Sequence, residues 1–323
     1  MRLGYFLSCE EYAPAELIEQ AKAAEQAGFE ALWISDHFHP WLEEQGQSAF
    51  VWSMIGALSQ VCSLPITTAV TAPTVRIHPA IIAQAAATSG VLTGGRFVLG
   101  VGSGEYLNEH ILGDPWPSAG IRLDMLEEAV EVIRELWSGR FVNHYGEHYQ
   151  VEQARIYTLP EQPPKIYVSG FGKKSIELAA RIGDGFMCVM PDAEKVRRFR
   201  ESGGGDKPVQ GGFKACYASS EDEAMRLAHQ KWRSEAVPGE LNQVLPSPRH
   251  TEQASSLVQP EMLKELFALG PDPARHLAMI EKYQQAGYDE VYVAGIGPHY
   301  RELIDLYAKE VMPRVRRRET VGA

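Results

Sequence analysis

Short apolar segments alternate along the chain with longer segments in which apolar residues recur every three or four positions. Such alternation predicts β-strands that are joined by helices and assembled into a parallel sheet. Eight apolar segments are predicted strands: residues 2–7, 31–35, 66–71, 97–101, 165–169, 185–189, 211–217 and 290–294. Eight parallel strands close a (β/α)8 TIM barrel, so we expect an α/β fold of this class.

Helix boundary signals lie between the predicted strands. Pro14, Pro79 and Pro273 each open a predicted helix, because proline suits the first helical turn. Gly28 suits the left-handed position that ends the first of these helices. A further helix that buries one face and ends near Gly139 is predicted from apolar residues at helical spacing: Leu126, Val130, Ile133, Leu136 and Trp137.

Two segments exceed the usual length of a loop and are predicted insertions in a single barrel domain that spans residues 1–323. Residues 139–164 alternate polar and apolar side chains around a turn at residues 143–146, which predicts a β-hairpin. Residues 237–269 contain several prolines and predict short helices over the barrel mouth, in the place of a lid.

Composition narrows the class of partner. Among 323 residues, 31 are basic and 42 acidic, and the formal net charge of −11 disfavours nonspecific binding to nucleic acid or an anionic membrane. No apolar run approaches the roughly 20 residues that span a bilayer, so we expect a soluble, cytoplasmic protein with a small-molecule substrate. The four cysteines lie far apart and predict buried, reduced thiols and no metal site: Cys9, Cys62, Cys188 and Cys216.

The second predicted strand ends in the sequence SDHFHPW, residues 35–41, where a barrel places its active site. His37 suits a general base for a hydroxyl group, because the pKa of histidine lies near neutrality. Asp36 suits a group that orients this imidazole or contacts a cofactor. The structural alternative is that Asp36 and His37 only cap a loop, and His39, which precedes a proline, equally shapes the turn.

The fourth predicted strand leads into GVGSGEYLNE, residues 100–109, where glycines allow a ligand to approach the backbone and Glu105 follows. A glycine pattern alone is weak, since it lacks the lysine of a phosphate loop and equally describes an ordinary bend. With His37 at a neighbouring strand end, however, Glu105 completes a candidate acid–base pair across the barrel mouth.

Two other strand ends carry groups that suit a flat, anionic ligand. Residues 67–74 are small or hydroxylated and suit the space beneath a ring, although they equally suit an ordinary strand. Residues 169–175 enter a helix whose free N–H groups favour an anion. Lys173 and Lys174 add positive charge there, or form a solvated helix surface.

Several of these segments together resemble the luciferase-like superfamily, most closely its deazaflavin-dependent glucose-6-phosphate dehydrogenases and alcohol dehydrogenases. The similarity rests on SDHFHPW, QSAFVWSMIGAL, TAPTVRIHPAIIAQAAATSG, GGRFVLGVGSGEYLNE, LWSG, ARIY and GDGFMCV. It covers residues 1–188 well and the remainder weakly. The resemblance implies a homodimer that binds coenzyme F420 across the barrel mouth and transfers a hydride to C5 of its deazaflavin ring.

The resemblance also implies roles for single residues. His37 is the expected base, Glu105 the group that protonates the reduced coenzyme or otherwise assists, and Trp41 a catalytic residue that lines the substrate pocket. Ala69 and Val70 fall where the family has a cis peptide bond beneath the ring. The other expected cofactor contacts are Asp36, Ala72, Asn108, Ser169, Gly170, Phe171 and Gly172, and the other expected substrate contacts are His39 and Val189.

The sequence departs from the sugar-phosphate members of the family. Val189 and Asp192 stand where those members have threonine and lysine, and Glu265 stands near their arginine. We therefore expect an alcohol or a sugar rather than glucose 6-phosphate, with glucose-6-phosphate dehydrogenase activity as one alternative. An FMN-dependent monooxygenase of the same superfamily is a second alternative, and a noncatalytic barrel that binds a small ligand is a third.

Overall fold

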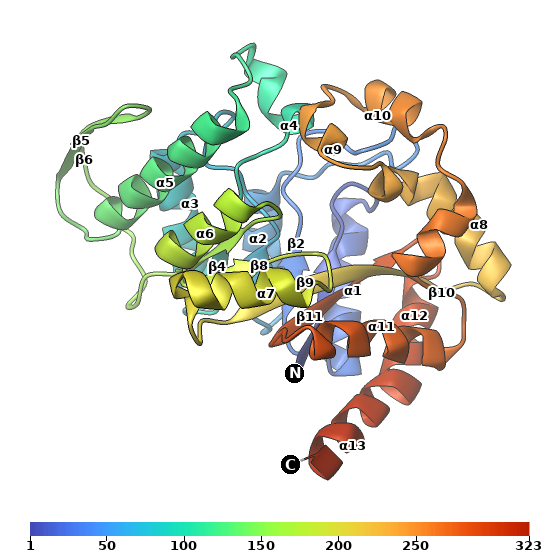
Figure 1. The fold of residues 1–323 in the computed structure, drawn as a ribbon. Coiled ribbons are helices and arrows are strands. Elements are labelled where there is room, and N and C mark those ends of the chain that lie inside the picture. Colours follow the sequence, from blue (N-terminus) through green and yellow to red (C-terminus); the bar gives the residue numbers. More distant parts are fainter. Residues whose placement is uncertain (323) are drawn as a thin grey trace.

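Parallel strands close into a barrel in the computed structural model, which describes residues 1–322 and the side chains of residues 1–317 (Figure 1). Around the barrel the order is β1 (Arg2–Leu7), β2 (Leu32–Ile34), β3 (Ile66–Thr68), β4 (Phe97–Val101), β7 (Lys165–Ser169), β8 (Gly185–Met187), β9 (Val209–Cys216) and β11 (Glu290–Ile296). Pairing of β11 with β1 and of β8 with β9 completes the circle. The predicted α/β TIM barrel is confirmed.

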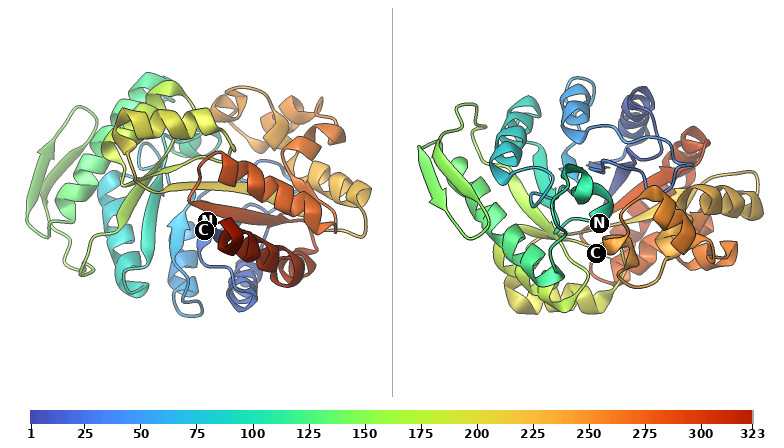
Figure 2. Two further views of the ribbon diagram at one scale, coloured as in Figure 1. Left: turned by 60° about the horizontal axis from the view of Figure 1, so that its bottom comes forward. Right: turned by 90° about the horizontal axis from the view of Figure 1, so that it is seen from above.

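Helices surround the barrel on its outside (Figure 2). They are α1 (Pro14–Ala27), α2 (Val51–Leu58), α3 (Pro79–Leu92), α4 (Tyr106–Glu109), α5 (Ala119–Leu136), α6 (Lys173–Ile182), α7 (Ala193–Phe199), α8 (Glu221–Trp232), α9 (Leu241–Val244), α10 (Pro248–Ser255), α11 (Pro273–Gln285), α12 (Tyr300–Leu306) and α13 (Met312–Gly322). Shorter helical turns span His110–Leu112, Arg200–Gly204, Arg233–Ala236, Pro260–Glu265 and Tyr307–Val311. The three prolines open α1, α3 and α11 as predicted, and Gly28 ends α1 with a φ of 94°.

Residues 139–164 and 237–269 lie between elements of the barrel. Residues 139–164 contain a two-stranded hairpin, β5 (Val142–Tyr145) and β6 (Gln150–Ala154), which projects from one side of the barrel (Figure 1). Its turn lies at residues 146–149 rather than at the predicted 143–146, because Tyr145 still pairs with Gln150 and the N–H of Gly146 donates to the carbonyl of Tyr149 at 3.0 Å. Most residues of the predicted turn, 143–145, therefore belong to β5.

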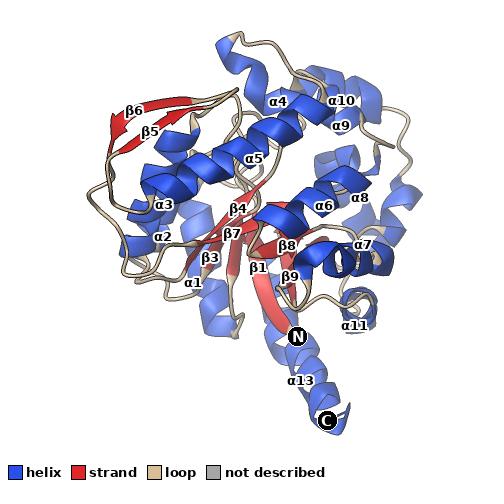
Figure 3. Cartoon of the chain, turned by 60° about the vertical axis from the view of Figure 1, so that its left-hand side comes forward, coloured by secondary structure: helices blue, strands red, loops and turns tan. Residues whose placement is uncertain are grey.

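The later insertion forms α9, α10 and the turn Pro260–Glu265, followed by a two-residue strand, β10 (Ala268–Leu269), that pairs with β9 outside the barrel. In Figure 3 the short helices α4, α9 and α10 gather at the end of the barrel away from both chain termini. The carboxyl ends of the barrel strands point to this end. Short helices thus lie within residues 237–269, whereas β10 was not predicted because it is so short.

The barrel interior contains a stack of aromatic side chains below the mouth. Trp33 lies parallel to Tyr292 with ring centroids 4.4 Å apart, and the ring edge of Phe6 meets Trp33 at 5.6 Å. The indole N–H of Trp33 donates to Gln210 Oε1 at 2.9 Å, which satisfies its buried polar atom. Rings from β1, β2 and β11 thus form a rigid floor on which a site at the strand ends can be built.

Substitution of Gly100 tests how closely the strands approach. A Cβ at Gly100 would overlap the carbonyl oxygen of Thr68 on β3, so Gly100→Ala is expected to destabilise the protein by about 1–3 kcal/mol. Gly56 is a matched control, because it lies in α2 and a Cβ there meets nothing within 4 Å. Gly56→Ala is expected to stabilise by about 0.5–1 kcal/mol. Urea unfolding measures both changes, and equal effects would contradict the argument.

Two further expectations concern thiols and membranes. All four cysteines are buried and free, as the reduced thiols predicted from their spacing. Within residues 1–322, none of the helices is both long enough and apolar enough to cross a bilayer.

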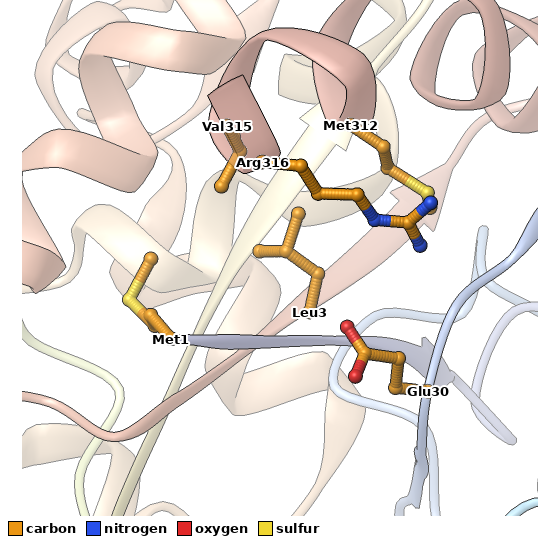
Figure 4. A pocket seen from close by; sticks show the side chains of 6 residues that line it. All are labelled: Met1, Leu3, Glu30, Met312, Val315 and Arg316. Carbon is orange, nitrogen blue, oxygen red and sulfur yellow. The ribbon is translucent and has the colours of Figure 1, made fainter. Parts of the chain in front are cut away.

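A small hollow lies at the amino end of the barrel, where β1 packs against α13 (Figure 4). Its volume is about 20 Å³, and its lining residues are Met1, Leu3, Glu30, Met312, Val315 and Arg316. That volume holds about one water molecule. This hollow is therefore too small for a cofactor or a substrate.

Candidate active site

A cavity of about 520 Å³ opens at the carboxyl ends of the barrel strands. Its volume falls within the range of roughly 300–1,000 Å³ that is usual for small-molecule sites. Every barrel strand except β11, or the loop that follows it, contributes to the lining. The predicted residues that it brings together are Asp36, His37, Trp41, Ala69, Val70, Ala72, Glu105, Asn108, Ser169, Gly170, Phe171, Gly172 and Val189.

His37 lies just beyond β2 with its Nε2 between two carboxylates. The distance from Nε2 to Glu10 Oε1 is 3.5 Å, and the distance to Glu105 Oε2 is also 3.5 Å. Its Nδ1 lies 3.1 Å from the carbonyl oxygen of His39, which can only accept a hydrogen bond. Nε2 is therefore the ring nitrogen that faces the two carboxylates, where an imidazole can exchange a proton.

Asn108 joins the base to the acid. Its Oδ1 accepts hydrogen bonds from the backbone N–H groups of Phe38 at 2.9 Å and His39 at 3.2 Å. These bonds orient the amide so that its Nδ2 donates to Glu105 Oε2 at 3.2 Å and lies 3.2 Å from His37 Nδ1. The resemblance implied that Asn108 holds the tail of a cofactor. Here it lies between the two groups that it positions.

Glu105 precedes α4 and lies inside the cavity, where about a third of its side chain, 34%, remains accessible. Burial raises the pKa of its carboxyl group to about 7, although the neighbouring His37 opposes the shift. Near neutrality the group is thus present in both protonation states. A carboxyl group of this pKa can give or take a proton at physiological pH.

Glu10 is the second carboxylate beside His37, and the sequence analysis did not predict it as a site residue. It lies beyond β1, is buried, and accepts a hydrogen bond from Ser35 Oγ at 2.6 Å through its Oε2. The other oxygen is the one that faces His37. Its position after the first predicted strand was a usable signal, because the strand-end rule applies to every strand of the barrel.

Asp36 contributes to the cavity wall but uses both carboxylate oxygens for internal bonds. Arg76 Nη2 donates to Oδ1 at 2.9 Å, and Thr71 Oγ1 donates to Oδ2 at 2.8 Å. The backbone N–H of Arg76 also donates to Glu109 Oε2 at 2.7 Å. Burial alone would lower the pKa of Arg76, but Asp36 and Glu109 raise it. This cluster connects the loops after β2 and β3 with α4.

Trp41 and His39 occupy different places. The ring of Trp41 lies in the cavity wall, 5.0 Å from the imidazole of His37 between centroids and tilted by 58°. His39 does not belong to the cavity lining within the described part of the chain. Its Nδ1 lies 2.8 Å from the carbonyl of Leu107, and its ring stacks on His110 at 5.9 Å. We therefore leave His39 out of the substrate site.

Small residues form the opposite wall. The Ala69–Val70 peptide bond is cis, as the resemblance implied, and a Cβ at Gly102 would come within 2.8 Å of Val70 Cγ2. From β7 the wall continues through the loop 169–172 to α6, where Lys173 and Lys174 also line the cavity. The arrangement leaves a broad surface of small side chains that ends at a helix N-terminus.

Comparison with known proteins places this site in a family. The sequence pattern described as luciferase-like monooxygenase matches residues 1–290. The chain belongs to this family. Among its relatives is an F420-dependent glucose-6-phosphate dehydrogenase of Segniliparus rotundus, 33% identical over 335 residues that cover 98% of each chain.

Two solved structures resemble the fold of this chain. An F420-dependent secondary alcohol dehydrogenase, in complex with an F420–acetone adduct, superposes with a TM-score of 0.91 at 32% identity, over 97% of this chain and 98% of that one. The coenzyme F420-dependent tetrahydromethanopterin reductase of Methanopyrus kandleri shares the fold, with a TM-score of 0.78 at 22% identity over 97% and 99% of the two chains.

One wall of the cavity in this luciferase-like barrel contains residues that the sequence analysis did not predict to lie there. Beyond Val189 and Cys188, that wall comprises Lys214, Trp232, Glu235, Glu240 and Gln243. Only Lys214 lies on a barrel strand, and the others follow α8 or end it. No sequence signal marked them, because the path of the insertion decides which of its side chains turn inward.

Asp192 and Glu265, which stand near a lysine and an arginine of the sugar-phosphate members, lie outside the cavity. Asp192 begins α7, where it accepts hydrogen bonds from the N–H of Glu194 at 2.9 Å and from Lys195 Nζ at 2.6 Å. Glu265 is exposed and pairs with Lys282 Nζ at 3.5 Å. Neither of them lines the cavity within the described residues. Asp192 lies at the start of α7 and Glu265 at the end of the turn Pro260–Glu265, and both elements lie outside the barrel.

The raised pKa of Glu105 predicts a pH-dependent stability. Because the folded state disfavours the ionised carboxyl, the penalty is absent below the ordinary pKa of 4.5 and grows as the pH rises through about 7. Glu105→Gln keeps an acceptor for Asn108 and removes the charge. The variant is therefore expected to gain thermal stability over the native protein at about pH 8 but not at about pH 5. A difference in Tm that does not change with pH would contradict this.

Proposed function

We propose that this chain is a coenzyme F420-dependent dehydrogenase that transfers a hydride between a C–H(OH) carbon of an alcohol or sugar and C5 of the deazaflavin. The observation that carries the proposal is His37 Nε2, placed in the cavity 3.5 Å from both Glu10 and Glu105. Relatives that cover the whole chain and are described as F420-dependent support the choice of cofactor.

The wall of small residues fits a deazaflavin. Ala69, Val70 and Gly102 leave space for a flat ring, and a larger side chain at Gly102 would collide with Val70. The loop 169–172 and the first N–H groups of α6 suit the phosphate of such a cofactor, with Lys173 and Lys174 beside it. When bound, F420 supplies the two-electron acceptor for the hydride.

The protein groups handle the protons. His37 Nε2 accepts the proton of the substrate hydroxyl group, and the carboxylates of Glu10 and Glu105 stabilise the imidazolium that results. Glu105, with its pKa of about 7, holds a proton that it can release within the cavity. Trp41 packs beside the imidazole and excludes water from it. Together these groups favour loss of the hydroxyl proton as the hydride departs.

A cofactor titration and a substrate screen test the proposal. Purified protein is titrated with F420 and with FMN, and oxidised F420 is then incubated with alcohols, sugars and sugar phosphates while its visible absorbance is followed. We expect binding of F420 and loss of its absorbance with at least one alcohol or sugar. A tight FMN complex with consumption of oxygen would overturn the proposal in favour of a monooxygenase. The homodimer and the single-domain organisation stay predictions.

A further inference from the structure

The cavity wall across from the cis peptide contains an ion pair. Lys214 projects from β9, which is separated from β3 by the same number of strands in both directions around the barrel. Its Nζ lies 2.7 Å from Glu235 Oε1, and the two side chains are 13% and 30% exposed. The pair therefore faces the space above the wall of small residues, on the side that remains for a substrate.

Trp232 fixes this pair in position. Lys214 Nζ lies 4.2 Å from the centroid of the Trp232 ring, close enough for a cation–π interaction. The indole N–H donates to Glu11 Oε2 at 2.5 Å, and Glu11 Oε1 accepts from the backbone N–H of Gly297 at 2.8 Å. Since Trp232 and Glu11 are held from both sides, the ammonium group is placed before any substrate arrives.

The pair offers hydrogen bonds that the protein does not use. An ammonium group has three donors, and among the described contacts Lys214 gives one of them, to Glu235. Glu235 Oε2 has no hydrogen bond in the same set of contacts. A hydroxyl group both donates and accepts, so neighbouring hydroxyls can satisfy the ammonium and the carboxylate together. An apolar alcohol would displace their water and leave them unpaired, which is unfavourable.

The charge of this wall opposes a phosphate. The charge of Lys214 is balanced by Glu235, and Glu10 and Glu240 add carboxylates to the same cavity. Arg122 also lines it, and its positive charge interacts with Glu240 while its guanidinium donates to the carbonyl of Pro117 and to Gln243. Lys214 and Arg122 thus each have a carboxylate beside them, so among the described residues of this wall neither offers an unopposed positive charge to an anionic substrate group.

We propose that the substrate is a neutral compound with several hydroxyl groups, such as an unphosphorylated sugar or polyol, whose nonreacting hydroxyls bind Lys214 and Glu235. This inference rests on the proposed function, in which His37 deprotonates the reacting hydroxyl. The proposed substrate, an alcohol or a sugar, is thereby restricted to uncharged compounds with several hydroxyl groups. Simple secondary alcohols and sugar phosphates are excluded as the best substrates.

Steady-state kinetics with F420 test the inference. The panel comprises neutral aldoses and polyols of three to six carbons, propan-2-ol, and glucose 6-phosphate. We expect the highest kcat/KM for a neutral polyhydroxylated compound. Lys214→Met is expected to lower that value by roughly 10- to 100-fold, mainly through KM, with a much smaller effect on propan-2-ol.

Two companion variants separate binding from folding. Glu235→Gln preserves the shape of the side chain but removes its charge. We expect this variant to bind the neutral substrate more weakly, with a lower kcat/KM, and to have a higher kcat/KM for glucose 6-phosphate. Lys195→Met removes the comparable ion pair with Asp192 outside the cavity and is expected to leave all substrates unchanged. Circular dichroism of each variant establishes that it has folded.

The outcomes distinguish this inference from the proposed function. A wild-type preference for propan-2-ol or glucose 6-phosphate overturns the inference while F420-dependent dehydrogenation stands. Equal losses on every substrate in folded Lys214→Met and Glu235→Gln overturn it as well. If F420 binds but no compound in the panel reduces it, the proposed substrate class is overturned, whereas the proposed cofactor stands. Absence of F420 binding overturns the proposed function itself.

Discussion

Replacement of His37 by alanine is expected to lower kcat by about 10²- to 10⁴-fold, the usual contribution of a general base. His37 Nε2 lies 3.5 Å from both Glu10 and Glu105 in the cavity, and the proposed function assigns the proton of the substrate hydroxyl group to this atom. Binding of F420 is expected to change little, because the proposed ring site lies on the wall formed by Ala69 and Val70. Stopped-flow reduction and fluorescence titration measure the two quantities.

His39→Ala is the matched control for this experiment. It removes a second imidazole from the same loop, but one that bonds to the carbonyl of Leu107 outside the cavity. Turnover by this variant is expected to remain close to that of the native protein. An unchanged rate in His37→Ala would favour a barrel that binds a ligand without catalysis, and equal losses in both variants would indicate damage to the loop.

Replacement of Arg76 by methionine is expected to cost about 3–5 kcal/mol of folding free energy, because it leaves buried carboxylates without a partner. The guanidinium donates to Asp36 at 2.9 Å and lies 3.5 Å from Glu109, and the side chains of these two acids are 0% and 1% exposed. Burial already raises the pKa of Glu109. Denaturant unfolding measures the loss.

The pH dependence of this loss has a definite sign. Arg76 opposes the effect of burial on the pKa of Glu109, so without Arg76 that pKa rises further in the folded state. Protonation of Glu109 then relieves the penalty, and the loss is expected to be smaller at about pH 5 than at about pH 8. Arg134→Met is the control, because it breaks a surface pair with Asp184 whose side chains are 43% and 35% exposed. It is expected to cost less than about 1 kcal/mol. A similar loss in both variants would contradict the role assigned to the cluster.

The candidate acid–base pair illustrates how well the ends of predicted strands locate a site. His37 and Glu105 were predicted because each follows an apolar segment of a barrel, and parallel strands bring their carboxyl ends to one edge. The structure places them 3.5 Å apart. Glu10 obeys the same rule after β1 but stands in a sequence with no other distinguishing feature. The rule therefore locates a ring of candidates without ranking them.

Other positions depended on contacts between distant segments. Asp192 lies only three residues beyond the cavity residue Val189, yet it caps α7 and faces outward. His39 lies two residues beyond His37 but bonds to Leu107. Lys214 and Glu235 are 21 residues apart and meet at 2.7 Å. Proximity in the sequence was a poor guide at each of these positions, since loop paths decide which side chains turn inward.

The sequence by itself determined the barrel, several helix boundaries and the residues of the candidate acid–base pair, because periodicity, prolines and glycines act locally and every strand of a closed parallel barrel ends at the same mouth. Only the tertiary structure decided that Asn108 lies between His37 and Glu105, that Arg76 pairs with buried Asp36 and Glu109, and that an ion pair beside Trp232 lines the cavity. Those contacts join residues from different loops, and their geometry depends on packing that no local pattern encodes.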